Sequence, residues 1–304
     1  MTPANDIAPR LSVVIPTFNN VAVLAKCLES WQTYASAEPI EIVVIEDGCR
    51  DETPQYLAKA AATPWGVRHV RWIHETNVHE LRATNRGLQE SRAPIVMTWH
   101  DDMFVRVPWL VRELLDTFDR YPAIGLLCLS RGLTCAPYDE PIATWDDVID
   151  WRRLQSTIGP GPLNWFALFE VDAVIRPWAV RRACLDRVGL LDEAFVPTGW
   201  DEADLAFRIR EAGWKVAVHG YERVGAFKHL GSTTFTKYSL NLERDLDNGR
   251  LFYGRWDEAI RRGSARARRT WRRPMTAGAW MHTLRMIGSY AVPSRRQAML
   301  DGEW

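Results

Sequence analysis

The sequence predicts an α/β fold with a mostly parallel sheet flanked by helices and a helical, basic C-terminal extension. Short apolar runs alternate with helix-length amphipathic segments through the first half of the chain. Acidic clusters directly follow two of these runs, where a parallel sheet would gather them at one edge. Arginines are concentrated beyond residue 255. We therefore expect ligands to bind in the loops that follow the strands.

The alternation begins with residues 11–16, a β-branched run closed by a proline, which predicts a buried strand. Residues 21–34 carry apolar side chains at helical spacing after two asparagines that can cap a helix. The same alternation predicts strands at 40–45, 70–73, 95–99 and 125–129, and helices at 53–61, 80–91 and 108–118. A looser stretch, 135–166, suits an acceptor-side insertion before a strand near 171–175 and a helix near 179–188.

Composition places the chain among ordinary globular proteins. It has 304 residues, 47% hydrophobic and 25% charged, which favours one α/β domain over 1–235 and a helical, Arg-rich extension over 236–304. The formal net charge of +0 gives no indication of nucleic-acid binding. Five cysteines without paired spacing suggest reduced thiols, and no apolar stretch has the length of a membrane span or signal. We expect a cytoplasmic location.

The first acidic cluster follows the strand at 40–45 and contains Asp47, Gly48 and Asp51. A carboxylate at such a strand end can accept hydrogen bonds from a nucleobase or a ribose, and the glycine permits a tight turn. An Asp-Gly turn followed by a helix cap at Asp51 explains the same residues equally well.

Adjacent carboxylates, Asp101 and Asp102, follow the strand at 95–99. Their mutual repulsion costs free energy unless a cation offsets it, and carboxylates beside a diphosphate suit Mg²⁺ or Mn²⁺. Helix capping is the alternative for such a pair.

The third acidic cluster, which includes Asp201 and Glu202, opens a segment with the apolar spacing of a helix. A helix N-terminus keeps carboxylates ionised, as a general base requires, although ordinary capping residues have the same placement. Beyond it, His229 follows an expected strand at 224–227 and could contribute a neutral imidazole to a metal, unless it is simply a core or surface histidine.

Taken together and in this order, residues 11–232 resemble the family 2 glycosyltransferases, inverting enzymes of the GT-A (Rossmann-like) fold. The opening strand and the residues after it are similar to the family's nucleotide-binding start, and Asp47 stands where the family reads the base. The segment 77–88, which contains Asn85, resembles the family's nucleotide-side helix. The resemblance assigns the nucleotide to Pro16, Thr17, Phe18, Asn19, Asp47, Asn85 and Asp101.

The triplet His100-Asp101-Asp102 is similar to the family's Asp-x-Asp motif, which implies a divalent metal, Mn²⁺ or Mg²⁺, on Asp102 and on His229. His100 departs from that motif and could itself contribute a ligand. Glu202 matches the family's general base, with Asp201 as the rival because the two acids stand in swapped order.

The mechanism implied by the resemblance is direct displacement with inversion at the anomeric carbon. The donor would be a nucleoside diphosphate sugar, with UDP or dTDP favoured, and the acceptor a glycan, a lipid-linked molecule or another hydroxyl compound. Trp200, beside the base, and Trp165 are the tryptophans we expect near substrate, because indole faces pack on sugar rings.

The extension gathers eight arginines between 255 and 273, and Trp280, Met281 and Leu284 follow. Such a segment could lie on anionic lipid at the inner face of the cell membrane. The alternative is a solvated helix that packs back on acidic loops of the α/β domain.

Two other interpretations share the predicted sheet. A dinucleotide-binding or nucleotidyltransferase domain is disfavoured, because neither a GxGxxG motif nor a Gly-rich basic loop follows the first strand. A catalytically degenerate GT-A protein, which binds a nucleotide sugar or glycan without turnover, is favoured by His100 and by the swapped order of Asp201 and Glu202.

Overall fold

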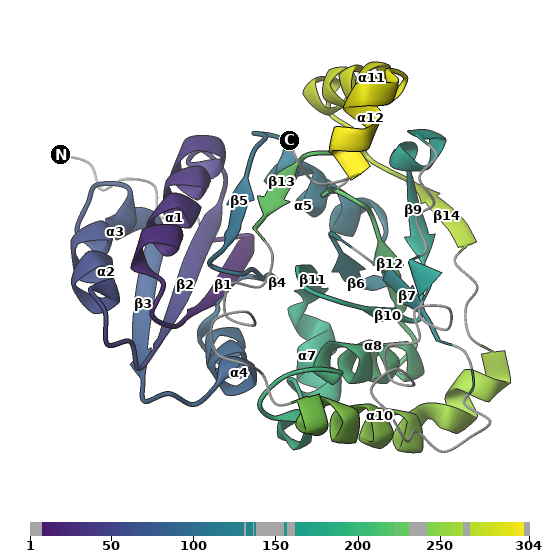
Figure 1. Cartoon of the computed structure of the whole chain (residues 1–304), viewed down its shortest axis with the longest axis horizontal. Helices are drawn as coiled ribbons and strands as arrows, with labels where there is room; N and C mark the ends of the chain where they lie inside the picture. Colours follow the sequence, from purple (N-terminus) through teal and green to yellow (C-terminus); the bar gives the residue numbers. More distant parts are fainter. Residues whose placement is uncertain are drawn as a thin grey trace.

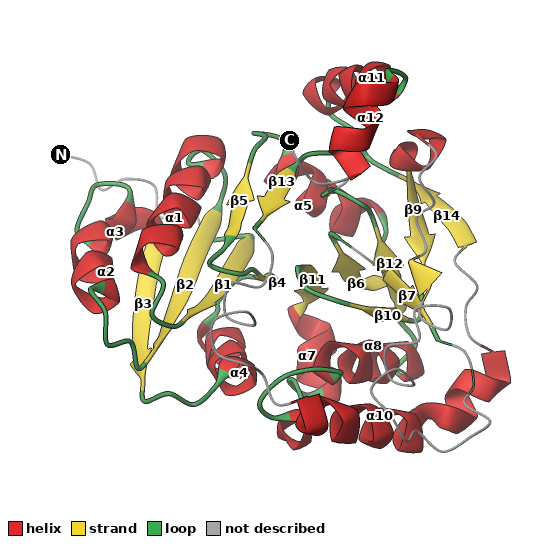
Figure 2. Cartoon of the chain, viewed as in Figure 1, coloured by secondary structure: helices red, strands yellow, loops and turns green. Residues whose placement is uncertain are grey.

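The computed structural model describes residues 8–130, 132–135, 137, 155–156, 162–222, 224–230, 242–263 and 268–300. One large sheet forms the centre of the protein, and helices cover both of its faces (Figures 1 and 2). In spatial order its strands are β14 (Arg268–Arg272), β9 (Ala167–Glu170), β12 (Lys215–Val218), β6 (Ile124–Cys128), β11 (Trp178–Arg181), β4 (Ile95–Thr98), β1 (Leu11–Thr17), β2 (Ile40–Asp47) and β3 (Val70–Glu75).

The sheet is mostly parallel, as the sequence predicts. Strands β1 to β4 pair in parallel, and β12 pairs in parallel with β6. Strand β11 runs against both β4 and β6, and β9 runs against both β12 and β14. All the other strands of this sheet therefore run in one direction and present their carboxyl ends at one edge.

Alternate residues of β1 enter opposite cores: Leu11, Val13 and Ile15 belong to one cluster and Val14 to the other. The first core is covered by α1 (Val21–Ala35), α2 (Thr53–Ala61), α5 (Leu110–Arg120) and α11 (Ala277–Tyr290). The second is covered by α4 (Glu80–Glu90), α7 (Arg182–Val188), α8 (Asp201–Glu211) and α10 (Leu242–Gly263). The short helix α3 (Gly66–His69) precedes β3. The predicted elements through residue 129 are confirmed, with boundaries shifted by one or two residues.

A two-stranded sheet stands beside the carboxyl ends of the parallel strands. It pairs β5 (Met103–Val105) with β13 (Phe227–His229) in antiparallel register, so that His229 lies opposite Met103. This register brings two segments more than a hundred residues apart to the same point. A three-stranded sheet consists of β10 (Ala173–Val174), β7 (Gly132–Thr134) and β8 (Gln155–Ser156).

Beyond residue 170 two predicted strands are wrong and one predicted helix begins later than expected. The expected strand at 171–175 is mostly a connection, of which only β10 is a strand, and the expected helix at 179–188 begins as β11 before α7. The expected strand at 224–227 is a turn that leads into β13, which contains His229. All three lie among short apolar runs whose helix and strand periods are indistinguishable. Most of the predicted insertion at 135–166 falls outside the described residues.

The C-terminal segment packs back on the sheet rather than standing apart. It contains α10, β14, α11 and α12 (Pro293–Leu300), and β14 forms the outer strand of the large sheet beside β9. The strand β14 was not anticipated from the sequence, which predicted only helices there. The proposed boundary at 235 lies outside the described residues. In the described part of the chain, no helix has the length and apolarity that a bilayer crossing requires.

A buried ion pair joins this segment to the first core. Arg273 donates from Nε to Glu113 Oε2 at 2.8 Å, and neither side chain has any exposed surface. The guanidinium also lies over the rings of Trp109 and Tyr221. Removing one partner of such a pair leaves an uncompensated charge in the interior.

We expect Arg273→Ala to lower the free energy of unfolding by about 3–5 kcal/mol, because Glu113 would lose its countercharge. The neighbouring, exposed Arg272→Ala is the control and should change stability by less than about 0.5 kcal/mol. Urea denaturation followed by circular dichroism measures both. Equal stability of the two variants would contradict this role of the ion pair.

Candidate active site

The loop after β1 connects the first strand with the acidic triplet. Thr17 donates its hydroxyl to Asp101 Oδ2 at 2.7 Å, and the side chain of Asn19 accepts from the backbone of Arg50 at 2.6 Å. Asn19 has a positive φ of 50°, a conformation that asparagine tolerates better than most residues. One edge of the sheet therefore carries five of the residues predicted to bind the nucleotide: Pro16, Thr17, Phe18, Asn19 and Asp101.

Asp47, the expected base-reading residue, is buried at the end of β2. Its two carboxylate oxygens accept the backbone N–H groups of Val78 and His79, at 2.6 and 3.0 Å. Each oxygen keeps a further lone pair for a ligand donor. Asp47 thus fixes the loop before α4 and can still contribute to a nucleotide site.

Asn85 makes a different contact from the one expected. Its amide nitrogen donates to Leu191 O at 2.8 Å, and its amide oxygen accepts from Leu191 N at 3.0 Å. Both ends of the buried amide are therefore used to attach α4 to the segment before α8. Asn85 therefore has a structural role, and the nucleotide contact that the family resemblance implied for it stays a prediction.

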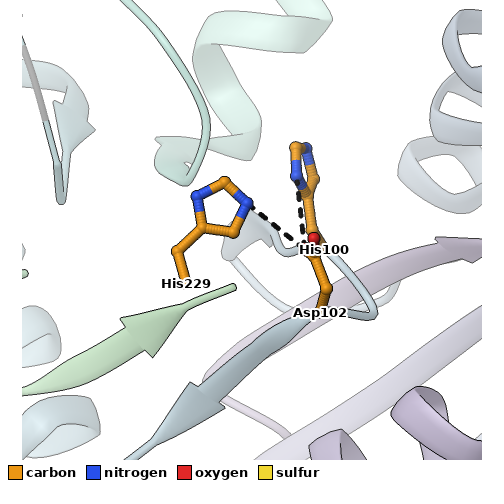
Figure 3. Close-up of side chains that lie close together, drawn as sticks. All are labelled: His100, Asp102 and His229. Carbon is orange, nitrogen blue, oxygen red and sulfur yellow. Dashed lines mark ion pairs between the residues drawn. The ribbon is translucent and has the colours of Figure 1, made fainter. Parts of the chain in front are cut away.

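Three side chains that could hold a metal ion meet where β4 ends and β13 approaches β5. Asp102 Oδ1 lies 3.3 Å from His229 Nε2 and 4.0 Å from His100 Nδ1. One ligand atom from each residue lies within 4.8 Å of the other two. Figure 3 shows both imidazole rings directed toward the carboxylate. One oxygen and two nitrogens at this spacing fit a divalent transition metal.

Burial sets the protonation of this corner of the site. It lowers the pKa of His100 to about 4, although Glu80 and Asp102 oppose that shift, so the ring is neutral near pH 7. Burial also raises the pKa of Asp101 to about 7. The hydrogen bond from Thr17 lowers this pKa, and the charge of Asp102 raises it further. Neutral imidazoles are the form in which histidine binds metals.

A buried arginine, Arg176, organises the other side of the site. It forms ion pairs with Glu80, with Asp201 Oδ2 at 3.1 Å and with Glu202 Oε1 at 2.7 Å. Glu80 Oε1 in turn lies 3.5 Å from His100 Nε2. A continuous series of charged and polar groups therefore links the metal-ligating cluster to the acids of α8.

The two rival base residues differ in accessibility. The side chain of Asp201 has no exposed surface and accepts from Gly199 N and Arg176, whereas that of Glu202 is 14% exposed. Burial raises the pKa of Glu202, and the charge of Asp201 raises it further, while Arg176 acts in the opposite direction. Glu202 thus has the open side and the raised proton affinity that suit a base.

The two tryptophans expected near substrate have different environments. Trp200 immediately precedes α8 in a left-handed conformation and packs against Phe252 and Tyr253. Trp165 is buried in the first core against Tyr290, so its ring does not face the site. This burial disfavours a sugar contact through the Trp165 ring, and its placement beside substrate stays a prediction.

Sequence reasoning missed Glu80 and Arg176. Glu80 opens α4, where a glutamate looks like an ordinary first-turn residue, and Arg176 precedes Pro177 in a connection with no periodicity. One feature of the sequence could have indicated Arg176. The expected site residues include several acidic side chains and no lysine or arginine, so a positive charge from elsewhere is needed to balance them.

The sheet order and the two-stranded sheet at the site define a GT-A fold. A crystal structure of GalNAc-T7 with UDP, GalNAc and Mn²⁺ superposes with a TM-score of 0.60 at 15% identity, over 83% of this chain and 49% of that one. At such low identity the likeness supports the fold alone.

Residues 12–160 match the family described as Glycosyl transferase family 2. The uncharacterized glycosyltransferase YibD of Escherichia coli is 26% identical over 192 residues, 55% of this chain and 50% of YibD. Validoxylamine A glucosyltransferase of Streptomyces hygroscopicus is 25% identical over 239 residues, 72% of this chain and 54% of that enzyme. The chain thus spans about half the length of these two curated relatives. Over residues 12–160 the chain is thus similar to glycosyl transferase family 2.

Proposed function

We propose that this chain is a metal-dependent, inverting glycosyltransferase. It moves a sugar from a nucleoside diphosphate donor, with UDP or dTDP favoured, to a hydroxyl of a glycan, a lipid-linked molecule or another acceptor. The observation that carries the proposal is the meeting of His100, Asp102 and His229 at the strand ends, linked through Glu80 and Arg176 to Glu202.

Each part of the site has a chemical task in this reaction. Asp102 and His229 would hold Mn²⁺ or Mg²⁺, which neutralises the negative charge that develops on the departing diphosphate. Thr17, Asn19, Asp47 and Asp101 would bind the nucleoside. Their fixed hydrogen bonds mean that little reorganisation is needed when the donor arrives.

Glu202 is the proposed general base. It would take the proton of the acceptor hydroxyl as that oxygen attacks the anomeric carbon, which inverts the configuration. Asp201 would hold Arg176 and the start of α8 in place, because its carboxylate is fully buried. Trp200 stands next to this base and could offer its ring to the acceptor.

One observation favours the alternative of a GT-A protein that binds without turnover. Arg176 Nε lies 2.7 Å from Glu202 Oε1, so one oxygen of the proposed base is held by a cation. The exposed side of Glu202 and its raised pKa favour the active enzyme instead. Turnover distinguishes the two.

We expect Glu202→Gln to lower kcat by about 10²–10⁴-fold without weakening the binding of UDP, because only the proton acceptor is lost. The control on the same helix is Glu211→Gln, which should retain full activity. Release of nucleoside diphosphate with acceptor and Mn²⁺ measures kcat, and calorimetry measures UDP binding.

The rate should also rise with pH, through values above the usual pKa of a glutamate, since the base must be ionised and burial disfavours the ionised form. An unchanged kcat in Glu202→Gln would remove Glu202 from the mechanism, and an absence of turnover in the unaltered protein with any donor would favour the binding protein.

We also propose that the chain works at the cytoplasmic face of the membrane and rests on anionic lipid through α11. Trp280, Met281 and Leu284 are 48%, 56% and 55% exposed, at positions that share one face of the helix. Figure 1 shows α11 and α12 projecting from the rest of the structure. Tryptophan is enriched at membrane interfaces, and the face is flanked by exposed Arg285.

The charges around this face favour contact with anionic lipid over contact with acidic loops of the α/β domain. Residues 277–296 contain three arginines and no acidic residue. Several arginines of the earlier run are instead neutralised on the protein: Arg255 pairs with Asp192, Arg261 with Asp257 and Arg273 with Glu113. We therefore assign the lipid contact to α11 and not to the arginine run at 255–273.

We expect the double substitution Trp280→Ser/Leu284→Ser to weaken binding to phosphatidylglycerol vesicles by about tenfold or more, because two apolar side chains no longer enter the interface. The control is Val67→Ser, which removes an apolar side chain that is 72% exposed on α3. Vesicle sedimentation measures the binding. Equal sedimentation of both variants with the unaltered protein would contradict a lipid contact through α11.

A further inference from the structure

His100 occupies a position in the metal-ligating cluster that differs from those of Asp102 and His229. It precedes Asp102 by two residues in the loop after β4, and its side chain is 28% exposed. Its ring faces the ring of His229, with centroids 5.7 Å apart at an interplanar angle of 71°. Figure 3 shows both rings next to the Asp102 carboxylate, with His229 on the left.

The two nitrogens of His100 have separate neighbours. Nδ1 faces Asp102 Oδ1 at 4.0 Å, whereas Nε2 faces Glu80 Oε1 at 3.5 Å. A histidine that binds a metal through one nitrogen almost always directs the other ring N–H to a carboxylate, a carbonyl or a water. Glu80 stands where that acceptor is needed.

Glu80 is itself held in place. It forms an ion pair with Arg176, whose side chain is only 3% exposed and also contacts Asp201 and Glu202. The ion pair with Arg176 fixes the Glu80 carboxylate beside Nε2, which leaves Nδ1 as the nitrogen that faces Asp102 and can bind a cation.

We propose, building on the glycosyltransferase function, that His100 is a third protein ligand of the metal through Nδ1 and that Glu80 is the positioning residue that orients its ring. The protein would then supply two imidazole nitrogens and one carboxylate. Such a set leaves the remaining coordination positions for the diphosphate of the donor.

This ligand set has a consequence for metal choice. Mg²⁺ prefers oxygen ligands in octahedral geometry, whereas imidazole nitrogens suit transition metals. Among these metals, the affinity of such a site is lower for Mn²⁺ than for Co²⁺ or Zn²⁺. The site should therefore bind Mn²⁺ or Co²⁺ in preference to Mg²⁺. Replacing the imidazole of His100 with a carboxylate should reduce that preference.

Pulsed electron paramagnetic resonance of bound Mn²⁺ tests the proposal, with Mn²⁺ alone and with Mn²⁺ and UDP. We expect two directly bound histidine nitrogens in the unaltered protein and one in His100→Ala. His100→Asp should leave one histidine nitrogen bound to Mn²⁺ and lower the ratio of Mn²⁺ affinity to Mg²⁺ affinity. Thermal unfolding of each variant verifies that it folds.

Glu80→Gln should keep both nitrogens but weaken Mn²⁺ binding by about 10–100-fold, the usual effect of losing a carboxylate that orients a ligand. Glu90→Gln is the control, because Glu90 is at the far end of α4 and pairs with Arg71 and Arg86. Unchanged affinity in Glu80→Gln would remove its positioning role.

Two bound nitrogens and unchanged affinity in His100→Ala would overturn the third ligand while leaving the proposed function intact. Survival of the Mn²⁺ signal in Asp102→Asn would instead contradict the metal site on which the function depends.

Discussion

The burial of like-charged carboxylates at one edge of the sheet is the constraint on which the rest of this structure depends. Asp101, Asp102, Asp201 and Glu202 all approach that edge from strand ends or a helix start, and each loses hydration there. Their repulsion must be offset by cations or hydrogen-bond donors. Arg176 does so on the side of α8, and a metal held by Asp102 and His229 would do so on the side of β5.

The fold supplies these positions from distant parts of the chain. Pairing of β5 with β13 sets His229 beside Asp102, and Asp47 fixes the loop that leads into α4 and Glu80. The C-terminal segment adds the edge strand β14 and the buried Arg273–Glu113 pair. The site residues are thus brought together by pairings between distant parts of the sequence.

The sequence predicts the regular part of this architecture and only part of the site. Most elements through β6 follow from clear periodicity, whereas the short elements α3, β5 and β9 to β11 have no period of their own and depend on tertiary contacts. Asp102 and His229 could be matched to a motif, but Glu80 and Arg176 belong to no pattern and gain their role only through spatial proximity. Asn85 and Trp165 show the converse, because residue types suited to binding are used here for packing.

The most direct test of this account is anomalous X-ray diffraction from crystals of the protein with Mn²⁺ and UDP, measured at the manganese absorption edge. The account predicts one strong peak bonded to Asp102 and His229, in contact with the diphosphate and facing Glu202. A peak elsewhere, or UDP bound away from the acidic edge of the sheet, would contradict it.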